Sequence, residues 1–434
     1  MSFEKGTCVP TTGVGQPHAS RKRRRLPTPP SSSSSDNASD CDLQPPNLPY
    51  VPGACFEIKP HNPPPPFDDG GWYHKPDPKE WNPNPWPWGE GSPDTIVEQL
   101  LAHSPRKTTP HSDQTTHHLQ ITHQIRCVDP CKAQIVRCLV DGRELVAKIF
   151  DPLYAGLNDC GFSPTYLSER CYSCEAAAYM RIKERGLDGR FTPKFEGCWN
   201  FELPLQDSKG GQVLREVRLI LQQFIPGDTM EALIERGEAE NIDPEVRLGI
   251  LARLTEATSQ LAFIGVRTND NHPRNFMLAK DGDNEWDITL IDFSHSRVRD
   301  LPNSKWRPRP GHDTRLPESP ITILDGSFPG GSCGGWLPKE YQGRGKKNYE
   351  RRLRWMKDRW EGSSQYGPVN YDWLSGPYED DSSDESTNGD SSDPNSGDDG
   401  PVKSHLPKTI LRKSTLPTTP PLAMMVPAEM TYKA

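Results

Sequence analysis

A hydrophobic pattern able to form a core covers only part of this chain, from about residue 115 to residue 300. Only 33% of the 434 residues are apolar, whereas 46 are proline and 35 are glycine. Polar, proline-rich segments bury too little surface to offset the conformational entropy lost on folding. Length alone would allow about three domains of roughly 150 residues, but this composition predicts one folded core between disordered ends.

The two ends of the chain differ from the core in composition. Residues 1–95 contain the basic run Arg21–Arg25, a serine tract and proline-rich stretches. Residues 366–434 contain an acidic stretch from Asp380 to Asp399 and a tail rich in proline and threonine. We predict that both ends are disordered. The basic run is either a nuclear localisation signal or a solvated run of charge.

Four tryptophans interrupt the N-terminal region: Trp72, Trp81, Trp86 and Trp88. Exposed aromatic clusters are rare because they usually pack on something. The segment is either an extended arm laid on the folded domain, which we favour, or a docking segment for a partner.

Cysteine content and the lack of long apolar runs indicate the compartment. The 11 cysteines, without an apolar signal-peptide core at the N-terminus, fit a reducing compartment better than a disulfide framework. No apolar run approaches the roughly 18 residues that span a bilayer. The net charge of -8 sums a basic and an acidic block, so it indicates no bulk nucleic-acid binding. We expect an intracellular protein, cytoplasmic or nuclear, that does not contact membranes.

The first half of the core has the pattern of an antiparallel sheet with one long helix. After a short helix near residue 96, strands are predicted at residues 118–126, 134–140, 144–150, 195–201 and 217–224. Asp141-Gly142 is a strong signal for a two-residue hairpin. A helix is predicted at residues 166–185, between the start signal Ser163-Pro164 and Gly186.

The second half of the core is predicted to be more helical. A turn at residues 225–228 leads to a short helix at 230–236 and a longer one at 244–263. Two short apolar runs at 275–279 and 287–291 suit a hairpin. After about residue 300, the last clear element is a basic helix at 349–360.

Lys148 is the first residue with a chemical role to explain, since its apolar neighbours in strand 144–150 imply that it is buried. A buried lysine needs an anionic partner. Glu175 is the natural candidate, because it lies in the next helix among small residues that permit close packing. A buried ion pair alone is a poor stabilising device, so positioning a phosphate is a better reason for the pair.

The stretch GVRTNDNHPRNFML, after the long helix, supplies further polar groups. Asp270 and Asn275 lie five residues apart in a loop broken by Pro273, so a carboxylate can face an attacking hydroxyl while an amide oxygen reaches a metal. Asp292 ends the apolar run ITLIDFS, and a carboxylate there is a normal magnesium ligand. Phosphoryl transfer needs the triphosphate held, its charge neutralised and the acceptor aligned, and these residues supply those needs.

These segments resemble protein kinases. VAKIF looks like the kinase strand with the phosphate-binding lysine, NDNHPRNFML resembles the catalytic loop, and IDFS stands where kinases carry Asp-Phe-Gly. His-Pro-Arg-Asn and the later Ile-Pro-Gly resemble a fungal group of protein-kinase-like domains, and they are similar to aminoglycoside and choline phosphotransferases. The resemblance covers fewer than half of the residues. It implies an α+β, two-lobed fold with disordered termini: a small antiparallel-sheet N-lobe over residues 96–226 and a mainly helical C-lobe over residues 227–365.

The resemblance also implies a role for each matching residue. Lys148 would contact the nucleotide phosphates, held by Glu175, and Asp270 would be the catalytic base. The metal ligands would be Asn275 and Asp292, and the residues at adenine would be Gln222, Gln223 and Phe224. His272 and Arg274 would orient the loop or meet the substrate. The implied cofactors are ATP and Mg²⁺, and the implied reaction transfers a phosphoryl group to a hydroxyl of a protein or a small molecule.

The sequence departs from the kinase pattern at several positions. CVDPCKAQ, between the first two strands, contains no glycine, so the backbone cradle over the phosphates is missing. Thr268 and Asn269 replace the residues that usually precede the catalytic aspartate, Ser294 replaces the metal-loop glycine, and no Ala-Pro-Glu element follows. The alternative is therefore a pseudokinase that acts as an interaction scaffold.

Structural roles compete with each of these assignments. Lys148 and Glu175 can form an ion pair in a nucleotide-free fold, and Asp270 and Asn275 can serve as capping and turn residues. Cys171 and Cys174 have metal-like spacing, as do Cys127 and Cys131. No second Cys or His pair follows either at a zinc-module interval, so we expect thiols rather than a zinc site.

Overall fold

The computed structural model describes residues 47–68, 71–81, 96–127, 133–155, 162–207, 209–280, 286–307, 315–327, 335–342, 345–369 and 371. Several predictions fall outside these ranges. They concern Arg21–Arg25, Trp86, Trp88 and the acidic stretch Asp380–Asp399.

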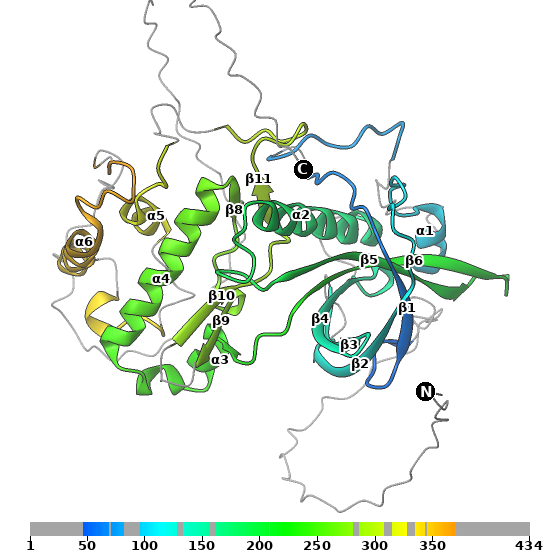
Figure 1. Ribbon diagram of the computed structural model, residues 1–434, viewed down its shortest axis with the longest axis horizontal. Coiled ribbons are helices and arrows are strands. Elements are labelled where there is room, and N and C mark those ends of the chain that lie inside the picture. Colours follow the sequence, from blue (N-terminus) through cyan, green and yellow to red (C-terminus); the bar gives the residue numbers. More distant parts are fainter. Residues whose placement is uncertain are drawn as a thin grey trace, which may run out of the picture. The chain divides into compact units, whose positions relative to one another are not determined.

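Six antiparallel strands close into a barrel in the order β1-β2-β3-β4-β6-β5 (Figure 1). The strands are β1 Cys55–Pro60, β2 His117–Arg126, β3 Gln134–Val140, β4 Arg143–Phe150, β5 Phe195–Gln206 and β6 Gln212–Gln223. β1 closes the barrel because Cys55–Ile58 pair with β2, whereas Lys59 and Pro60 pair with β5. The barrel core includes Ile58, Val136, Ile149 and Leu219.

The predicted two-lobed protein-kinase-like fold, with a small antiparallel-sheet N-lobe and a mainly helical C-lobe, is wrong. The structure is α+β, but its strands close into a six-stranded barrel, and two further small sheets accompany the helices of the second half. The sequence pattern predicts no strand before residue 96, because only Ile58 of β1 is fully buried and the strand ends on Pro60. Without β1, the other five strands would form an open sheet.

The predicted hairpin between β3 and β4 is confirmed. Asp141 has φ 49° and Gly142 has φ 82°, the left-handed pair that a tight hairpin requires. Val140 and Arg143 therefore pair directly across the turn. This register places Lys148 opposite Ile135 on one side and Ile220 of β6 on the other.

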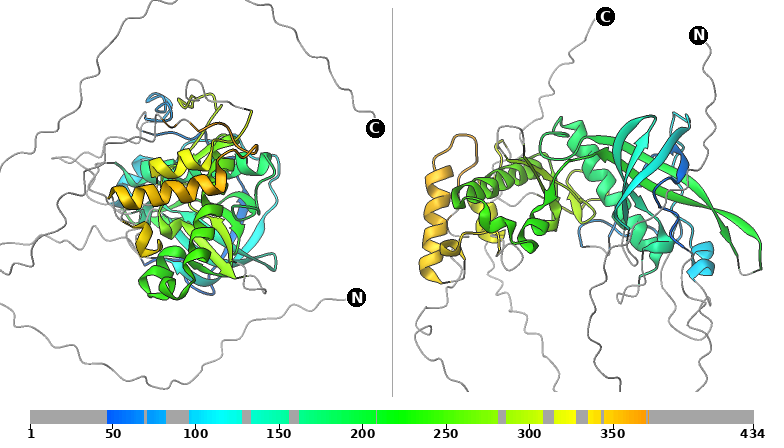
Figure 2. Two further views of the ribbon diagram at one scale, coloured as in Figure 1. Left: turned by 90° about the vertical axis from the view of Figure 1, so that its left-hand side faces the viewer. Right: turned by 90° about the horizontal axis from the view of Figure 1, so that it is seen from below.

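β5 and β6 extend beyond the barrel as a two-stranded ribbon (Figures 1 and 2). They remain paired as far as Gln206 and Gln212, whereas β4 pairs only with Arg218–Gln223 of β6. The predicted strands at 195–201 and 217–224 miss this outer part. The reason is that most of its side chains are at least partly exposed, so they lack a clear apolar alternation.

Helix α2, Pro164–Glu184, packs against β4, β5 and β6. The Oγ of Ser163 accepts a hydrogen bond of 3.1 Å from the backbone N–H of Tyr166, which caps the helix. Gly186, at φ 67°, ends it in the left-handed conformation that favours glycine. The predicted helix at residues 166–185 is confirmed to within two residues.

Within the described ranges, the second half combines four α-helices with two small sheets (Figures 1 and 2). The helices are α3 Met230–Glu235, α4 Pro244–Phe263, α5 Pro320–Ser327 and α6 Lys346–Trp360; the short helix α1, Ile96–Ala102, precedes the barrel strand β2. One sheet has the order β10-β9-β7, from Trp286–Leu290, Phe276–Lys280 and Asp228–Thr229. The other pairs β11, Ser296–Val298, with β8, Val266–Thr268. The predicted helices at 230–236 and 244–263 and the predicted hairpin are confirmed, whereas β7, β8, β11 and α5 were not predicted.

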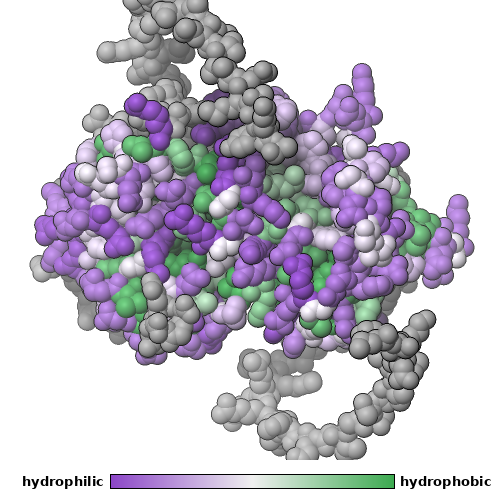
Figure 3. Space-filling view, in the orientation of Figure 1, coloured by the Kyte–Doolittle hydropathy of each residue, from purple (hydrophilic) through white to green (hydrophobic). Residues whose placement is uncertain are grey.

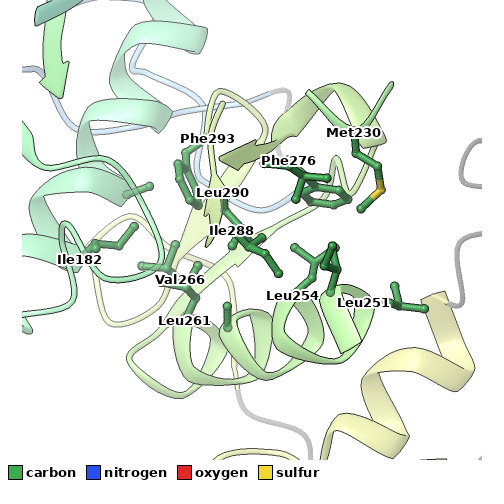
Figure 4. Packing of buried hydrophobic residues seen from close by; sticks show 14 of the residues in the cluster. Ile182, Met230, Leu251, Leu254, Leu261, Val266, Phe276, Ile288, Leu290 and Phe293 are labelled. Atoms are coloured by element: carbon green, nitrogen blue, oxygen red, sulfur yellow. The ribbon is translucent and has the colours of Figure 1, made fainter. Parts of the chain in front are cut away.

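A second hydrophobic cluster joins α2, α4 and these small sheets. Figure 4 shows Leu254 and Leu261 of α4 facing the side chains of Phe276, Ile288 and Leu290. Phe293, which is 1% exposed, belongs to the same cluster. The residue before it, Asp292, is therefore held in place by the core on which Phe293 packs.

The face in Figure 3 is mostly hydrophilic, with small, separate hydrophobic areas. The large apolar side chains are gathered instead in the two clusters described above. None of the helices within the described ranges is both long and apolar enough to cross a membrane.

The closing strand β1 provides a test of the barrel. Ile58→Ala should lower the free energy of unfolding by about 2–5 kcal/mol, because it removes a fully buried side chain and leaves a cavity. Urea unfolding measures this change. Glu57→Ala, an exposed neighbour on the same strand, should stay within about 0.5 kcal/mol of the wild type. Equal unfolding midpoints for the two variants would contradict a structural role for β1.

His61, directly after β1, joins that strand to α2. Its Nδ1 lies 2.7 Å from the hydroxyl of Tyr172, and its Nε2 lies 3.0 Å from the Oγ1 of Thr108. Burial, together with the nearby positive charge of Arg218, lowers the pKa of His61 to about 4. The neutral ring is therefore the form that the folded protein favours.

This lowered pKa predicts a specific loss of stability in acid. Unfolded His61 binds a proton near its ordinary pKa of about 6.5, so stability is fully present above that pH and falls as the pH drops from there to about 4, where folded His61 also binds a proton. The loss amounts to about 3 kcal/mol. His61→Gln should flatten this part of the stability curve, measured by urea unfolding between pH 7 and pH 4. His118→Gln, at an exposed position of β2, should leave it unchanged; a parallel curve for His61→Gln would contradict the assignment.

Candidate functional site

Lys148 connects three separate elements through its ammonium group. All residues of β4 from Leu145 to Phe150 are buried, and Lys148 is 4% exposed. Its Nζ donates to the Oε2 of Glu175 at 2.6 Å and to the Oδ1 of Asp292 at 2.8 Å. The structure therefore brings these three predicted site residues together from β4, α2 and the segment that follows β10.

One ammonium cannot neutralise two carboxylates, and this imbalance determines their charge states. Burial raises the pKa of Glu175 to about 7, although Lys148 partly opposes the shift. Burial acts in the same direction on Asp292, but Lys148 and the hydrogen bonds from Ser294 outweigh it and hold the pKa of Asp292 well below its usual range. Burial disfavours the charged form of Lys148, yet Asp292 and Glu175 together raise its pKa. Lys148 and Asp292 therefore stay charged near neutral pH, while Glu175 can hold a proton.

Asp292 has an unusual backbone conformation. Its φ of 61° is left-handed, which costs a residue other than glycine about 1 kcal/mol or more. The Oγ of Ser294 donates to its Oδ1 at 2.7 Å, and the backbone N–H of Ser294 donates to the same atom at 3.2 Å. Ser294, for which the resemblance to kinases implied a glycine, thus supplies a donor to Asp292, and the sequence did not predict this role.

The loop with Asp270 and Asn275 is held by its own side chains. Arg274 Nη2 donates to both carboxylate oxygens of Asp270, at 3.0 and 2.9 Å. Asn275 Nδ2 donates to the backbone carbonyl of Asp270 at 2.8 Å, which leaves its Oδ1 as the side-chain atom able to meet a cation. His272 Nδ1 lies 3.3 Å from a carboxylate oxygen of Glu231 in α3.

This loop is attached to the segment that carries Asp292. The backbone N–H of Ile291 donates to the carbonyl of Asn275 at 2.9 Å, and Asn269 Nδ2 donates to the carbonyl of His295 at 3.0 Å. Asp270 and Ser294 line one pocket with a volume of about 250 Å³. The predicted base and the predicted metal ligands therefore belong to two joined loops.

The three residues predicted at adenine begin two positions beyond Ile220, the residue of β6 opposite Lys148: Gln222 and Gln223 end β6, and Phe224 follows it. The Oε1 of Gln222 accepts from the hydroxyl of Tyr179 at 2.7 Å, and that of Gln223 accepts from the backbone N–H of Lys194 at 3.2 Å. The guanidinium of Arg137 lies 4.2 Å from the ring centroid of Phe224. The hydrogen bonds described for Gln222 and Gln223 thus go to other parts of the protein and not to Lys148, Asp270 or Asp292.

The donor set around Asp292 suits one kind of metal ion. Across the described ranges, no group of three or more His, Cys, Asp or Glu side chains is placed to hold a metal by itself. Cys127, Cys171 and Cys174 are not in disulfides, and Cys131 lies outside these ranges. Asp292 and Asn275 offer hard oxygen donors, which fit Mg²⁺ bound together with phosphate oxygens.

Part of the N-terminal region lies against this site. The hydroxyl of Tyr73 accepts from the backbone N–H of Val298 at 2.6 Å, and the ring of Trp72 lies 3.5 Å from the guanidinium of Arg297. Trp81 stacks on Tyr166 of α2, with the ring centroids 6.2 Å apart. Trp72 and Trp81 thus belong to an arm laid on the folded domain. The sequence indicated this arm because exposed aromatic clusters are rare.

No family model matches this sequence, and no curated protein matches it. The function of the site therefore has to be inferred from its own geometry.

The charge balance around Lys148 leads to a pH-dependent prediction. Lys148→Met should lower the free energy of unfolding by about 3–5 kcal/mol at pH 8, because it leaves two buried carboxylates without their cation. Because Lys148 opposes the upward shift that burial causes in the pKa of Glu175, its removal should raise that pKa further. Glu175 then stays protonated in the folded variant at pH values where the unfolded chain is ionised, so stability should fall as the pH rises from 6 to 8. Urea unfolding at pH 6 and pH 8 measures the difference.

Two further variants control this experiment. Lys148→Met/Glu175→Gln should lose most of the pH dependence, since glutamine has no charge to bury. Lys59→Met, at an exposed position of β1, should behave as the wild type at both pH values. Equal stability of Lys148→Met at pH 6 and pH 8 would show that Glu175 does not titrate in this range.

Proposed function

We propose that this chain is an ATP- and Mg²⁺-dependent phosphotransferase that transfers a phosphoryl group to a hydroxyl of a protein or a small molecule. The observation that supports it best is the contact of one buried ammonium with both Glu175 and Asp292. A buried charge cluster is a weak source of stability compared with apolar packing. Binding of a ligand whose phosphate oxygens replace one of these carboxylates at Lys148 would explain why the protein contains this cluster.

Each polar residue has a role in this proposal. Lys148 binds the nucleotide phosphates, and Glu175 fixes its ammonium. Asp292 and Asn275 hold Mg²⁺, which neutralises charge on the phosphates when it is bound. Asp270 accepts the proton of the acceptor hydroxyl while the hydroxyl oxygen bonds to the γ-phosphorus and ADP leaves with the electrons of the broken P–O bond.

Two contacts must change before this reaction can occur. Lys148 has to exchange Asp292 for phosphate oxygens, so that the carboxylate becomes available to Mg²⁺. Arg274 has to loosen its contact with both oxygens of Asp270, because a carboxylate engaged by a guanidinium is a poor proton acceptor. Both exchanges replace one charge-assisted hydrogen bond by another.

A catalytically inactive interaction scaffold is the second candidate. It is favoured by the same two contacts, since Lys148 and Asp270 already have their charges compensated without a nucleotide. The absence of glycine from CVDPCKAQ also favours it, because side chains there hinder a close approach of the backbone to phosphates.

We further propose that the protein acts in the cytoplasm, the nucleus or both. The basic run Arg21–Arg25 supports nuclear entry. Six cysteines within the described ranges are not in disulfides, which fits a reducing compartment: Cys55, Cys127, Cys138, Cys171, Cys174 and Cys198.

Nucleotide binding separates the two candidate functions. A ligand that binds only the folded form must stabilise it, by about 2.7 kcal/mol at a hundred times its Kd. Mg²⁺ and millimolar ATP should therefore raise the melting temperature of the wild type, and Lys148→Met and Asp292→Asn should lose most of the shift. Asp287→Asn, an exposed aspartate earlier in β10, should keep it. No shift for the wild type would favour the scaffold.

The chemical step is tested by transfer of the γ-phosphate of labelled ATP to water or to the protein itself. Asp270→Asn should reduce the rate by about 10²- to 10⁴-fold, the usual contribution of a general base. It should retain the melting shift with Mg²⁺ and ATP, because Asp270 does not bind the nucleotide in this proposal. Asp287→Asn again serves as the control. Equal transfer by Asp270→Asn and the wild type would remove Asp270 from its role.

A further inference from the structure

The pocket beside Asp270 is built from distant parts of the chain. Its walls include Asp68, Trp72 and Tyr73 of the N-terminal arm, Arg170 of α2, and Asn269 and Asp270 of the loop after β8. Its volume of about 250 Å³ is below the range of drug-sized ligand sites, about 300–1,000 Å³. Its size therefore suits a small molecule.

The arm that forms one wall is fixed by hydrogen bonds. The backbone N–H of Lys305 donates to the carbonyl of Trp72 at 2.7 Å, and Tyr73 forms a β-bridge with Ser304. The carboxylate of Asp68 accepts from the backbone N–H groups of Trp72 and Tyr73, at 2.7 and 3.1 Å. The pocket therefore has a defined wall on this side.

The acidic and the basic side chains of this pocket differ in whether the protein itself compensates their charge. Both carboxylates on its walls already have donors: Asp68 has the two backbone N–H groups, and Asp270 has Arg274. Arg170 is only partly buried, and within the described ranges its guanidinium forms no ion pair or hydrogen bond; the Oγ of Ser173 donates instead to its backbone carbonyl, at 3.3 Å. It is the cation on this wall that remains available to a ligand.

Other partly or fully buried arginines of the barrel and α2 region have carboxylate partners. Arg218 pairs with Glu169 at 2.6 Å, Arg215 with Asp151 at 2.5 Å, and Arg106 lies 3.8 Å from Glu169. A guanidinium presents several donors in a planar fork that suits carboxylate and phosphate groups. Arg170 therefore differs from these neighbours by lacking an internal anion.

We infer that this pocket binds the phosphate acceptor, and that the acceptor is a small hydroxyl-bearing anion whose carboxylate or phosphate group is bound by Arg170. The inference rests on the proposed function, because it assigns the substrate of the same Asp270. The anion contacts Arg170, and the hydroxyl lies at the Asp270 end of the pocket. The hydroxyl transfers its proton to Asp270 and receives the phosphoryl group of ATP.

Matched pairs of acceptors test this assignment. N-acetylserine is compared with N-acetylserinamide, and glycerol 3-phosphate with glycerol, because each pair differs in one anionic group. In the wild type at least one anionic member should accept labelled phosphate about ten- to a hundredfold faster than its neutral partner, the usual effect of a charged hydrogen bond. The pair that shows the preference identifies a carboxylate or a phosphate as the group bound.

Arg170→Gln should abolish this preference and keep the melting shift with Mg²⁺ and ATP. Arg185→Gln, at an exposed position just beyond the end of the same helix, should retain both. Nucleotide binding with no preference for anions, or with a preference that survives in Arg170→Gln, would overturn the inference and leave the proposed function intact.

A failure of the proposed function gives a different pattern. In that case the wild type shows no melting shift with Mg²⁺ and ATP, and the acceptor pairs are tested by calorimetric binding without nucleotide. Binding of N-acetylserine or glycerol 3-phosphate that is lost in Arg170→Gln would still support an anion site in this pocket. Absence of binding to the wild type would overturn it.

Discussion

The ammonium of Lys148 is the interaction on which the arrangement of this protein depends. It lies in a strand whose inner residues are all buried, so its charge has to be met by the protein itself. The two carboxylates that meet it come from α2 and from the segment that follows β10, 27 and 144 residues away in the sequence. The barrel, the long helix and the small sheets must therefore all be in place before Lys148 has its partners.

The N-terminal region contributes to the barrel around Lys148 and also to the packing around α2 and the segment after Asp292. Cys55–Pro60 closes the barrel that contains Lys148, and the segment around Tyr73 and Trp81 contacts α2 and the chain after Asp292. His61 lies between these two contributions and is hydrogen-bonded to Tyr172 of α2. The composition of this region is that of a solvated extension. It nevertheless completes the core, because its few apolar side chains lie where the other strands would leave a sheet edge unpaired.

Local sequence patterns were enough to predict many helices and strands, but not the closure of the strands into a barrel. The hairpin at Asp141-Gly142 and the helix α4 depend on residues within a few positions of each other, and both are found where predicted. β1, β8 and β11 were missed because short strands are specified by partners far away in the sequence, and β1 was the strand that turned an open sheet into a barrel. Lys148 and Glu175 were paired correctly because a buried charge demands a partner. The contact of Lys148 with Asp292, which was predicted only as a metal ligand, and the clamp of Arg274 on Asp270 have no such signature.

The two bound carboxylates differ in a way that suits exchange with a ligand. Glu175 is fully buried, so separating it from Lys148 would leave two buried polar groups without solvent. Asp292 is 22% exposed and also accepts two hydrogen bonds from Ser294, so it can lose Lys148 and remain solvated and bonded. Breaking the contact between Lys148 and Asp292 therefore costs less free energy than breaking the contact between Lys148 and Glu175. Anionic oxygens that approach Lys148 from the solvent side would displace Asp292 first and leave the pair with Glu175 intact, which is the order that a nucleotide-binding site requires.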